Sequence, residues 1–255
     1  MQHLNFTVVQ THLFWEDIDA NLAHFSMKLE QIEQTDVIIL PEMFTTGFSM
    51  KPEKLASESR VKALDWMKAL AAEKQSAVTG SFMNEEAGKY YNTLAFVQPD
   101  GGVQSYHKRH LFTPGDESRH YTAGGERLIV NYKGWKICPL ICYDLRFPVF
   151  SRNTVDYDLL IYVANWPEKR NYAWQQLLKA RAIENQCYLI ACNRIGEDGN
   201  GINHIGNSCI INFMGEEIGF SNEDKCYNFN LSKTPLEEIR KQFPVLSDRD
   251  KFELL

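Results

Sequence analysis

Three ionisable side chains of different chemistry each stand where a predicted strand ends. Glu42 follows the apolar run 37–40, Lys108 closes a run of strands, and Cys142 follows the apolar run 137–141. Open α/β sheets gather reactive groups outside the carboxyl ends of their strands. A thiolate is a strong nucleophile, a carboxylate can take its proton, and an ammonium can stabilise a developing oxyanion. Together, the three groups could carry out nucleophilic catalysis with the cysteine as nucleophile.

Each of the three residues also has an ordinary structural explanation. Most free cysteines behave as small buried hydrophobes, which is the alternative role for Cys142. Most glutamates are solvated, so Glu42 alone is weak evidence. Lys108 lies in the basic segment 106–110, and basic clusters usually lie on the solvent-exposed surface. The hypothesis therefore requires all three side chains to meet in one site.

Two other functional classes compete for the same cysteine. A Cys–His hydrolase would pair Cys142 with His107, His110 or His204, but it leaves the strand-end carboxylate and ammonium without a role. A non-enzymatic thiol or redox protein needs an exposed second cysteine near the first. Cys138 lies inside the apolar run, where it is poorly placed for thiol exchange.

The elements that must position these residues follow from hydrophobic periodicity. Alternation predicts a half-buried strand, a continuous apolar run predicts a buried strand, and three- and four-residue steps predict an amphipathic helix. Strands that alternate with helices, with hairpins between, indicate an α/β fold with mixed sheets. The predicted strands cover 4–8, 37–40, 77–82, 90–98, 128–130, 135–141, 158–163, 188–192 and 208–213, and the predicted helices begin at Asp17 and cover 61–71 and 170–185.

Two segments are predicted as loops. The polar segment 110–125 contains two Gly-containing turns and is long for a compact domain, which is typical of a functional loop. The Gly-rich segment 196–201 separates two predicted strands.

The composition limits the class of protein. The 255 residues are 44% hydrophobic and 24% charged, and no linker marks a boundary, so we expect a single domain over 1–255. A formal charge of −6 argues against nucleic acid and acidic membrane surfaces as partners and favours a small molecule. No secretory signal or membrane-spanning run is visible, so we expect a cytoplasmic protein. Its six cysteines form no C-x-x-C pair, so we expect no metal.

Three segments resemble the signature motifs of the nitrilase (carbon–nitrogen hydrolase) superfamily, in the order and at the spacing of that family. They are residues 40–44, 106–112 and 142–148, and the segments 91–93, 181–186 and 199–208 resemble its ancillary motifs. The resemblance implies an α-β-β-α four-layer sandwich of two mixed sheets flanked by helices. It also implies a homodimer or higher homo-oligomer and an enzyme that uses no cofactor.

The resemblance assigns catalytic roles by position. Cys142 is the expected nucleophile, Glu42 the general base and Lys108 the oxyanion stabiliser. Glu117 matches a second glutamate that positions the lysine or the substrate, with Asp116 as the alternative because this loop varies in length.

The resemblance also suggests residues that bind the substrate. The main-chain N–H of Tyr143 is a second oxyanion donor. Arg146 matches an arginine that binds a substrate carboxylate in some members, with a structural ion pair to Asp144 or another acidic residue as the alternative. Asn165 and Trp166 match a loop beside the pocket, and structural packing explains them equally well.

The substrate class follows from two further segments. Residues 41–48 and 242–250 resemble ω-amidases, which hydrolyse the terminal amide of 2-oxoglutaramate or 2-oxosuccinamate. An aliphatic amidase, an N-carbamoyl hydrolase or a deaminated-glutathione amidase remains the alternative within the superfamily. The sequence leaves the acyl group and the oligomer size open.

Overall fold

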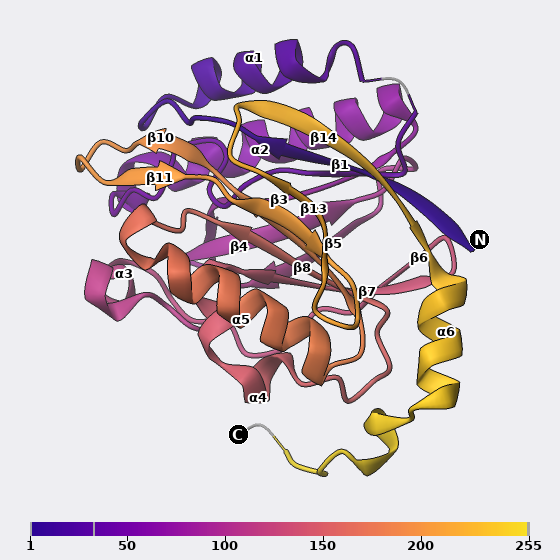
Figure 1. The fold of residues 1–255 in the computed structure, drawn as a ribbon. Helices are drawn as coiled ribbons and strands as arrows, with labels where there is room; N and C mark the ends of the chain where they lie inside the picture. Colours follow the sequence, from indigo (N-terminus) through magenta and orange to yellow (C-terminus); the bar gives the residue numbers. More distant parts are fainter. Residues whose placement is uncertain (1, 33, 254–255) are drawn as a thin grey trace.

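The computed structural model describes residues 2–32 and 34–253, which form two six-stranded sheets packed face to face (Figure 1). The first sheet has the order β14-β1-β2-β3-β4-β5 and the second β13-β12-β9-β8-β7-β6. The strands of the first sheet are β1 (His3–Gln10), β2 (Val37–Ile39), β3 (Ala77–Glu86), β4 (Lys89–Val97), β5 (Val103–His107) and β14 (Lys225–Ser232). Those of the second are β6 (Val130–Tyr132), β7 (Trp135–Ile141), β8 (Leu159–Ala164), β9 (Tyr188–Asn193), β12 (Ser208–Ile211) and β13 (Glu217–Ser221).

Both sheets are mixed. In the first sheet β1, β2 and β3 are parallel, whereas β4, β5 and β14 join by antiparallel pairing. In the second sheet β7, β8 and β9 are parallel, with antiparallel strands on both sides. Parallel strands need helical crossovers, and these helices cover the outer faces of the sheets.

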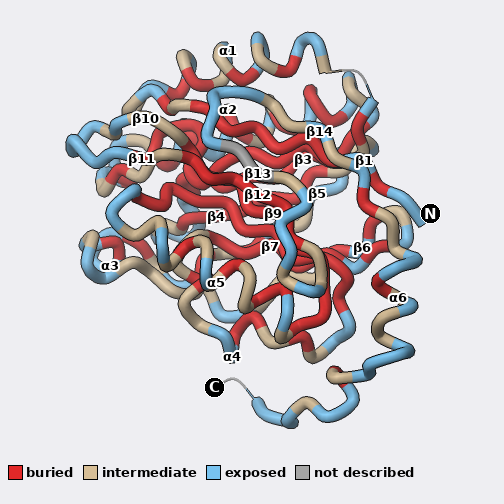
Figure 2. Tube along the Cα trace, in the orientation of Figure 1, coloured by how far each residue is buried: buried red, intermediate tan, exposed pale blue. Residues whose placement is uncertain are grey.

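Helices flank the sandwich and the main core lies between the sheets. α1 (Ile18–Leu29) and α2 (Pro52–Lys74) bury apolar side chains against the first sheet, and α5 (Asn171–Glu184) packs on the second. Figure 2 shows the buried strands enclosed by more exposed helices and turns. The predicted four-layer α-β-β-α sandwich is therefore confirmed.

Three shorter helices complete the chain, with four 3-10 turns. The helices are α3 (Glu117–His120), α4 (Pro148–Ser151) and α6 (Lys233–Gln242), and the turns are η1 (Thr113–Gly115), η2 (Cys142–Arg146), η3 (Glu168–Arg170) and η4 (Val245–Asp248). Within residues 2–32 and 34–253, no helix combines the length and apolarity that crossing a membrane requires.

The structure corrects several sequence expectations. In α2 the predicted residues Met67, Leu70 and Ala71 are buried, but Val61 is 52% exposed and lies outside the face that packs on the sheet. The loop 110–125 contains η1 and α3. The Gly-rich segment 196–201 forms part of a hairpin, β10 (Ile195–Glu197) and β11 (Asn203–Ile205). The sequence reading also missed β13, β14 and α6.

Candidate active site

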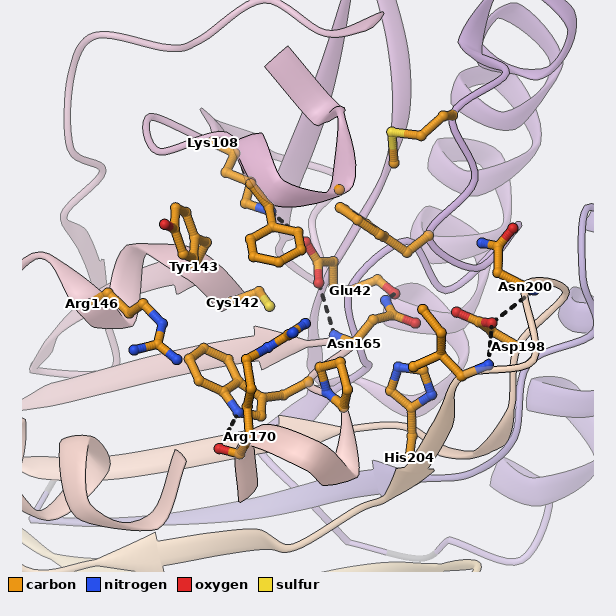
Figure 3. A pocket seen from close by; sticks show the side chains of 17 residues that line it. Glu42, Lys108, Cys142, Tyr143, Arg146, Asn165, Arg170, Asp198, Asn200 and His204 are labelled. Carbon is orange, nitrogen blue, oxygen red and sulfur yellow. Dashed lines mark hydrogen bonds and ion pairs between the residues drawn. The ribbon is translucent and has the colours of Figure 1, made fainter. Parts of the chain in front are cut away.

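The strand ends of both sheets meet at one cavity (Figure 3). Glu42 follows β2 and Lys108 follows β5 in the first sheet, whereas Cys142 follows β7 in the second. All three side chains line the same cavity, which is also lined by Phe48, Met50, Phe112, Gly115, Tyr143, Arg146, Asn165, Trp166, Pro167, Arg170, Asp198, Asn200, Ile202 and His204. The three groups predicted from strand ends therefore lie together.

A buried ammonium joins two buried carboxylates at the floor of this cavity. Lys108 Nζ lies 2.8 Å from Glu42 Oε1, and 3.0 and 2.9 Å from the two carboxylate oxygens of Glu117. All three side chains are fully buried. Glu117 also accepts a hydrogen bond from the Phe112 main-chain N–H at 2.5 Å. Asp116 instead pairs with the exposed Arg119, so Glu117 is the second acidic residue beside the lysine.

The carboxylate of Glu42 is held from both sheets. Its Oε1 accepts from Asn92 Nδ2 at 2.8 Å, in addition to Lys108. Its Oε2 accepts from the main-chain N–H of Asn165 at 2.8 Å, and Asn165 Nδ2 donates to the main-chain oxygen of Glu42 at 2.6 Å. Asn165 therefore lines the cavity and also orients the carboxylate.

Cys142 lies on a sharp turn between β7 and η2. Its φ is +42°, a left-handed backbone conformation that is uncommon for residues other than glycine and is often found at functional sites. Asp144 fixes this turn because its carboxylate accepts from the Ile141 N–H at 3.0 Å, the Tyr106 hydroxyl at 2.7 Å and the His110 N–H at 3.1 Å. The turn thus presents the thiol to the cavity on an anchored backbone.

Burial and the neighbouring carboxylates control protonation. Burial and the carboxylate of Glu42 raise the pKa of the Cys142 thiol, and the opposing effect of Lys108 is smaller. For Lys108, burial disfavours the charge, but Glu117 and Glu42 outweigh it and raise the pKa. In the resting site the Cys142 thiol is therefore neutral and lies beside Glu42, and Lys108 is protonated.

The pKa of the second carboxylate, Glu117, is higher than that of a solvated glutamate. Burial and repulsion from Glu42 raise the pKa of Glu117 above its ordinary value, although Lys108 opposes them. Two carboxylates that share one ammonium cannot both ionise as easily as separate ones.

Tyr143, Arg146 and Trp166 line the cavity above the cysteine. The guanidinium of Arg146 lies 5.0 Å from the ring centre of Trp166. Within the described part of the chain Arg146 makes no ion pair with Asp144, whose oxygens are bound by other groups. The ion pair with Asp144 is therefore not formed in this part of the chain, and Arg146 instead packs on Trp166.

The histidines of the rival Cys–His scheme do not contact the thiol in the residues described. His107 bonds Thr93 and stacks on Tyr91, whereas His110 bonds Asp144. His204 lines the cavity, but burial and nearby Arg194 lower its pKa to about 4.

The other rival scheme needed a second reactive cysteine. Cys138 is buried in β7, and burial raises the pKa of its thiol to about 12. It is therefore inert beside Cys142.

Sequence reasoning missed three contributors. Asn92 was noticed only as part of an ancillary motif. Arg170 also lines the cavity and lies four residues beyond Trp166, after the end of β8. Its position close to Trp166 in the sequence could have indicated that it belongs to the site. The β10–β11 hairpin supplies Asp198 and His204 to the cavity rim, and its Gly-rich sequence concealed the pairing.

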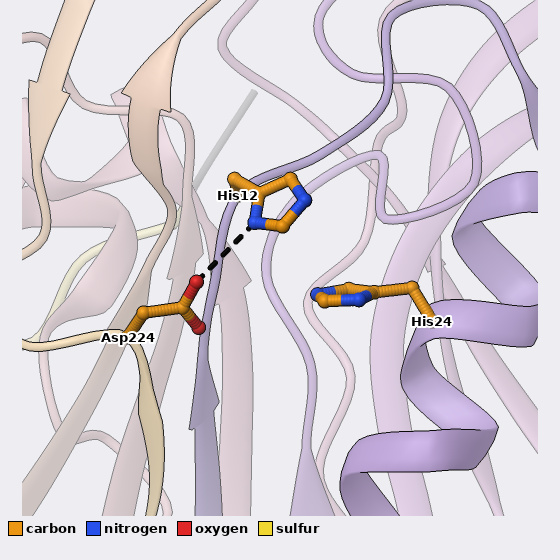
Figure 4. Close-up of side chains that lie close together, drawn as sticks. All are labelled: His12, His24 and Asp224. Carbon is orange, nitrogen blue, oxygen red and sulfur yellow. Dashed lines mark hydrogen bonds and ion pairs between the residues drawn. The ribbon is translucent and has the colours of Figure 1, made fainter.

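Among the residues that the structure describes, one group of side chains outside the cavity has the proximity that a metal requires. The ligand atoms of His12, His24 and Asp224 lie within 4.8 Å of one another (Figure 4). However, Lys28 Nζ lies 2.5 Å from Asp224 Oδ1, and Thr11 Oγ1 lies 2.7 Å from His24 Nε2. A divalent cation at this position would be repelled by the Lys28 ammonium. The cluster is therefore better explained as a structural contact between α1 and the β13–β14 turn than as a metal centre.

Known proteins share this sequence and architecture. The carbon–nitrogen hydrolase family matches residues 6–225. The chain is 46% identical over 256 residues to omega-amidase YafV of Escherichia coli (strain K12), with 100% of both chains covered. It is 34% identical over 232 residues to 2-oxoglutaramate amidase of Bacillus subtilis (strain 168), with 89% of each covered.

A solved structure matches equally completely. A CN-hydrolase superfamily protein of Xanthomonas campestris, crystallised with an arsenic adduct in its active site, superposes with a TM-score of 0.96 at 41% identity. That match covers 100% of both chains. By sequence over its whole length and by architecture, the chain belongs to the carbon–nitrogen hydrolase family.

Proposed function

We propose that this protein is an ω-amidase, which hydrolyses the terminal amide of 2-oxoglutaramate or 2-oxosuccinamate to the 2-oxo dicarboxylate and ammonia. The observation that carries the proposal is the buried Glu42–Lys108–Glu117 group beside Cys142 in one cavity. The whole-length similarity to an omega-amidase and the similarity to a 2-oxoglutaramate amidase support the substrate class.

The first half of the reaction forms a thioester. Glu42 accepts the thiol proton as Cys142 sulfur attacks the amide carbon, and a tetrahedral oxyanion forms. The Lys108 ammonium and the Tyr143 main-chain N–H stabilise this oxyanion. When the intermediate collapses, Glu42 returns its proton to the leaving nitrogen and ammonia departs. The raised pKa of the thiol explains why the attack needs a base.

The second half releases the acid. Glu42 takes a proton from water, the hydroxide oxygen attacks the thioester carbon, and the same donors stabilise the second oxyanion. Collapse breaks the C–S bond, and the cysteine recovers its proton from Glu42. Glu117 stays beside Lys108 throughout and positions the ammonium, which makes two ionic contacts with it and one with Glu42. These steps use side chains and water alone, and the proposal includes no cofactor.

Arg146 is the proposed carboxylate-binding residue. Its guanidinium lines the cavity beside Trp166, and a planar fork of N–H donors suits a carboxylate. Trp166 forms the wall on which this arginine stacks.

Ammonia release from a substrate panel tests the proposal. The panel contains 2-oxoglutaramate, 2-oxosuccinamate, glutamine, N-carbamoyl amino acids and simple nitriles. We expect the two 2-oxo amides to have the highest kcat/KM. Higher kcat/KM for an N-carbamoyl amino acid or a neutral amide would replace this proposal with another amidase of the family.

The proposal also covers the number of domains, the cellular compartment and the oligomeric state. We place the activity in one domain over 1–255, in the cytoplasm, where the six free cysteines would stay reduced. We also infer a homodimer or higher homo-oligomer, because Tyr172 and Ile183 on α5 are 79% and 50% exposed and Met214 is 56% exposed. Light scattering on the purified protein tests the oligomeric state.

A further inference from the structure

A second guanidinium, that of Arg170, enters the cavity from η3, at the start of α5. Figure 3 shows this side chain extending into the space beside Cys142 and Asn165. Its guanidinium carbon lies 4.9 Å from the ring centre of Phe112. The cavity therefore has two arginines, each placed against an aromatic ring.

The hydrogen-bond donors of these two guanidiniums are available to a ligand. A guanidinium that stacks through its face keeps its in-plane N–H groups free. Within residues 2–32 and 34–253, the side chains of Arg146 and Arg170 make ring contacts but no hydrogen bond or ion pair. By contrast, the buried Arg181 and the partly buried Arg240 donate to carboxylates and main-chain oxygens.

Asp198, a carboxylate on the cavity rim, already accepts two main-chain hydrogen bonds. Asp198 Oδ1 accepts from the main-chain N–H groups of Asn200 and Ile202, at 2.8 and 3.0 Å. Partial burial of a cation is unfavourable unless it gains a partner of opposite charge. The arrangement at Arg146 and Arg170 thus suits an anion that arrives from solution.

Trp166 links the two arginines. Its ring supports the Arg146 guanidinium, and its indole N–H donates to the main-chain oxygen of Arg170 at 2.9 Å. Trp166 is almost fully buried, so it holds the Arg146 guanidinium and the main chain of Arg170 in fixed positions at the cavity. A substrate whose amide carbon reaches Cys142 would direct the rest of its chain into the same space.

We propose that Arg170, together with Arg146, binds the substrate carboxylate that lies remote from the scissile amide. This inference rests on the proposed amidase function and assigns Arg170 as a specificity-determining residue. It defines the preferred substrate as the monoamide of a dicarboxylic acid. The two cations bind the carboxylate through charge-assisted hydrogen bonds, which neutral amides of equal length cannot form.

A merely structural role for Arg170 makes a different prediction. Phe112, on which Arg170 stacks, donates its main-chain N–H to Glu117 beside Lys108. If Arg170 acted only by holding this loop, its loss would disturb the ammonium and lower kcat for every amide alike. A binding role raises KM selectively for acidic amides.

The experiment compares 2-oxoglutaramate with pentanamide in the full-length protein. For Arg170→Gln we expect kcat/KM for 2-oxoglutaramate to fall about 10- to 100-fold more than kcat/KM for pentanamide, mainly through KM. Arg170→Lys keeps the positive charge but loses the planar pair of N–H donors. Its selectivity for the acidic amide should therefore lie between those of the wild-type protein and Arg170→Gln. Lys169→Gln removes a neighbouring exposed cation that does not line the cavity, and should leave the ratio unchanged.

A binding measurement separates recognition from chemistry. The Cys142→Ala protein cannot turn over, so titration with 2-oxoglutarate reports affinity alone. Adding Arg170→Gln should weaken this affinity by a factor similar to the kinetic loss. Equal losses for both amides, or unchanged 2-oxoglutarate affinity, would overturn the role of Arg170. If the wild-type protein releases no ammonia from either amide, the proposed function itself fails.

Discussion

The main-chain N–H of Asn165 donates to Oε2 of Glu42 across the interface between the two sheets, at 2.8 Å. The two residues are 123 positions apart and follow strands of different sheets, β8 and β2. The orientation of the general base therefore depends on how the sheets are packed. The side-chain amide of Asn165 reinforces this link by donating to the main-chain oxygen of Glu42.

Replacing Asn165 by Ala tests this link. The main-chain hydrogen bond can persist, but the side-chain bond at 2.6 Å is lost and leaves the Glu42 carbonyl unpaired. We expect kcat for 2-oxoglutaramate to fall about tenfold and stability to fall by about 1–3 kcal/mol. Steady-state kinetics and urea unfolding measure both. Unchanged values for both quantities would remove Asn165 from the positioning of the base.

Cys142→Ala should abolish turnover while the protein stays folded. Alanine lacks the sulfur that forms the thioester, and the site has no other nucleophile in the proposed mechanism. Mass spectrometry of substrate-treated protein should detect no acyl adduct in this variant. Cys138→Ala is the matched control, because it removes a buried thiol from the same strand region and should cost only about 1 kcal/mol of stability. Wild-type-like turnover by Cys142→Ala would reject the mechanism.

Lys108→Met should lower kcat by about 10²–10³-fold, because an oxyanion donor is lost. The two buried carboxylates also lose their shared cation, so we expect a stability loss of about 3–5 kcal/mol at pH 7. Lower pH should reduce that loss, because protonating one carboxylate relieves the repulsion. Thermal unfolding at pH 7 and pH 5 measures the difference. Lys169→Met, an exposed site, provides the control, and an equal effect there would contradict the electrostatic explanation.

Arg146→Ala should raise KM for 2-oxoglutaramate more than for a neutral amide. The truncation removes a fork of donors that lines the cavity and makes no bond to Asp144. Loss of one charge-assisted interaction corresponds to about 10- to 100-fold in affinity. A purely structural arginine would affect both substrates equally, and parallel kinetics with the two amides distinguish the cases.

His204→Gln should reduce the acid sensitivity of the fold. His204 is almost completely buried, and its pKa is lowered to about 4 from an ordinary value of 6.5. The unfolded chain thus binds a proton more readily than the folded one below pH 6.5. The contribution of His204 is present above that pH and is lost as pH falls toward 4. Between pH 7 and pH 5, the wild-type protein should lose about 2 kcal/mol more unfolding free energy than His204→Gln.

Urea titrations at the two pH values measure this difference. The same variant should retain most amidase activity, as should His107→Ala, because neither imidazole is the general base in the proposed mechanism. A large activity loss in both variants, with little loss in Lys108→Met, would favour the Cys–His scheme.

The sequence predicted the parts of the site that are attached to strand ends. The apolar run before Cys142 and the charge immediately after it mark such an end, and the same logic placed Glu42 and Lys108. Local periodicity cannot show which strands become neighbours. The contacts of Glu42 with Asn92 and Asn165 join residues 50 and 123 positions apart, so only the folded structure could reveal them.

Other features escaped because their local signals were weak or misleading. The hairpin β10–β11 has three-residue strands in a Gly-rich segment, which reads as a loop. By contrast, strand β14 was missed although Tyr227, Phe229 and Leu231 alternate with polar residues, the pattern of a half-buried strand. The sequence favours Glu117 with Asp116 as the alternative, and only the turn into α3 shows that the glutamate is directed inward.

The pairing of β1 with β14 has a consequence for how the chain matures on the ribosome. His3 pairs with Ser232 and Gln10 with Lys225, so β1 leaves the ribosome long before one of its two neighbours is synthesised. Until then that flank of β1 presents unsatisfied backbone groups to other nascent chains. A polypeptide stopped before β14 should thus be recovered as aggregates rather than as a shortened enzyme, even though every proposed catalytic residue has already been synthesised.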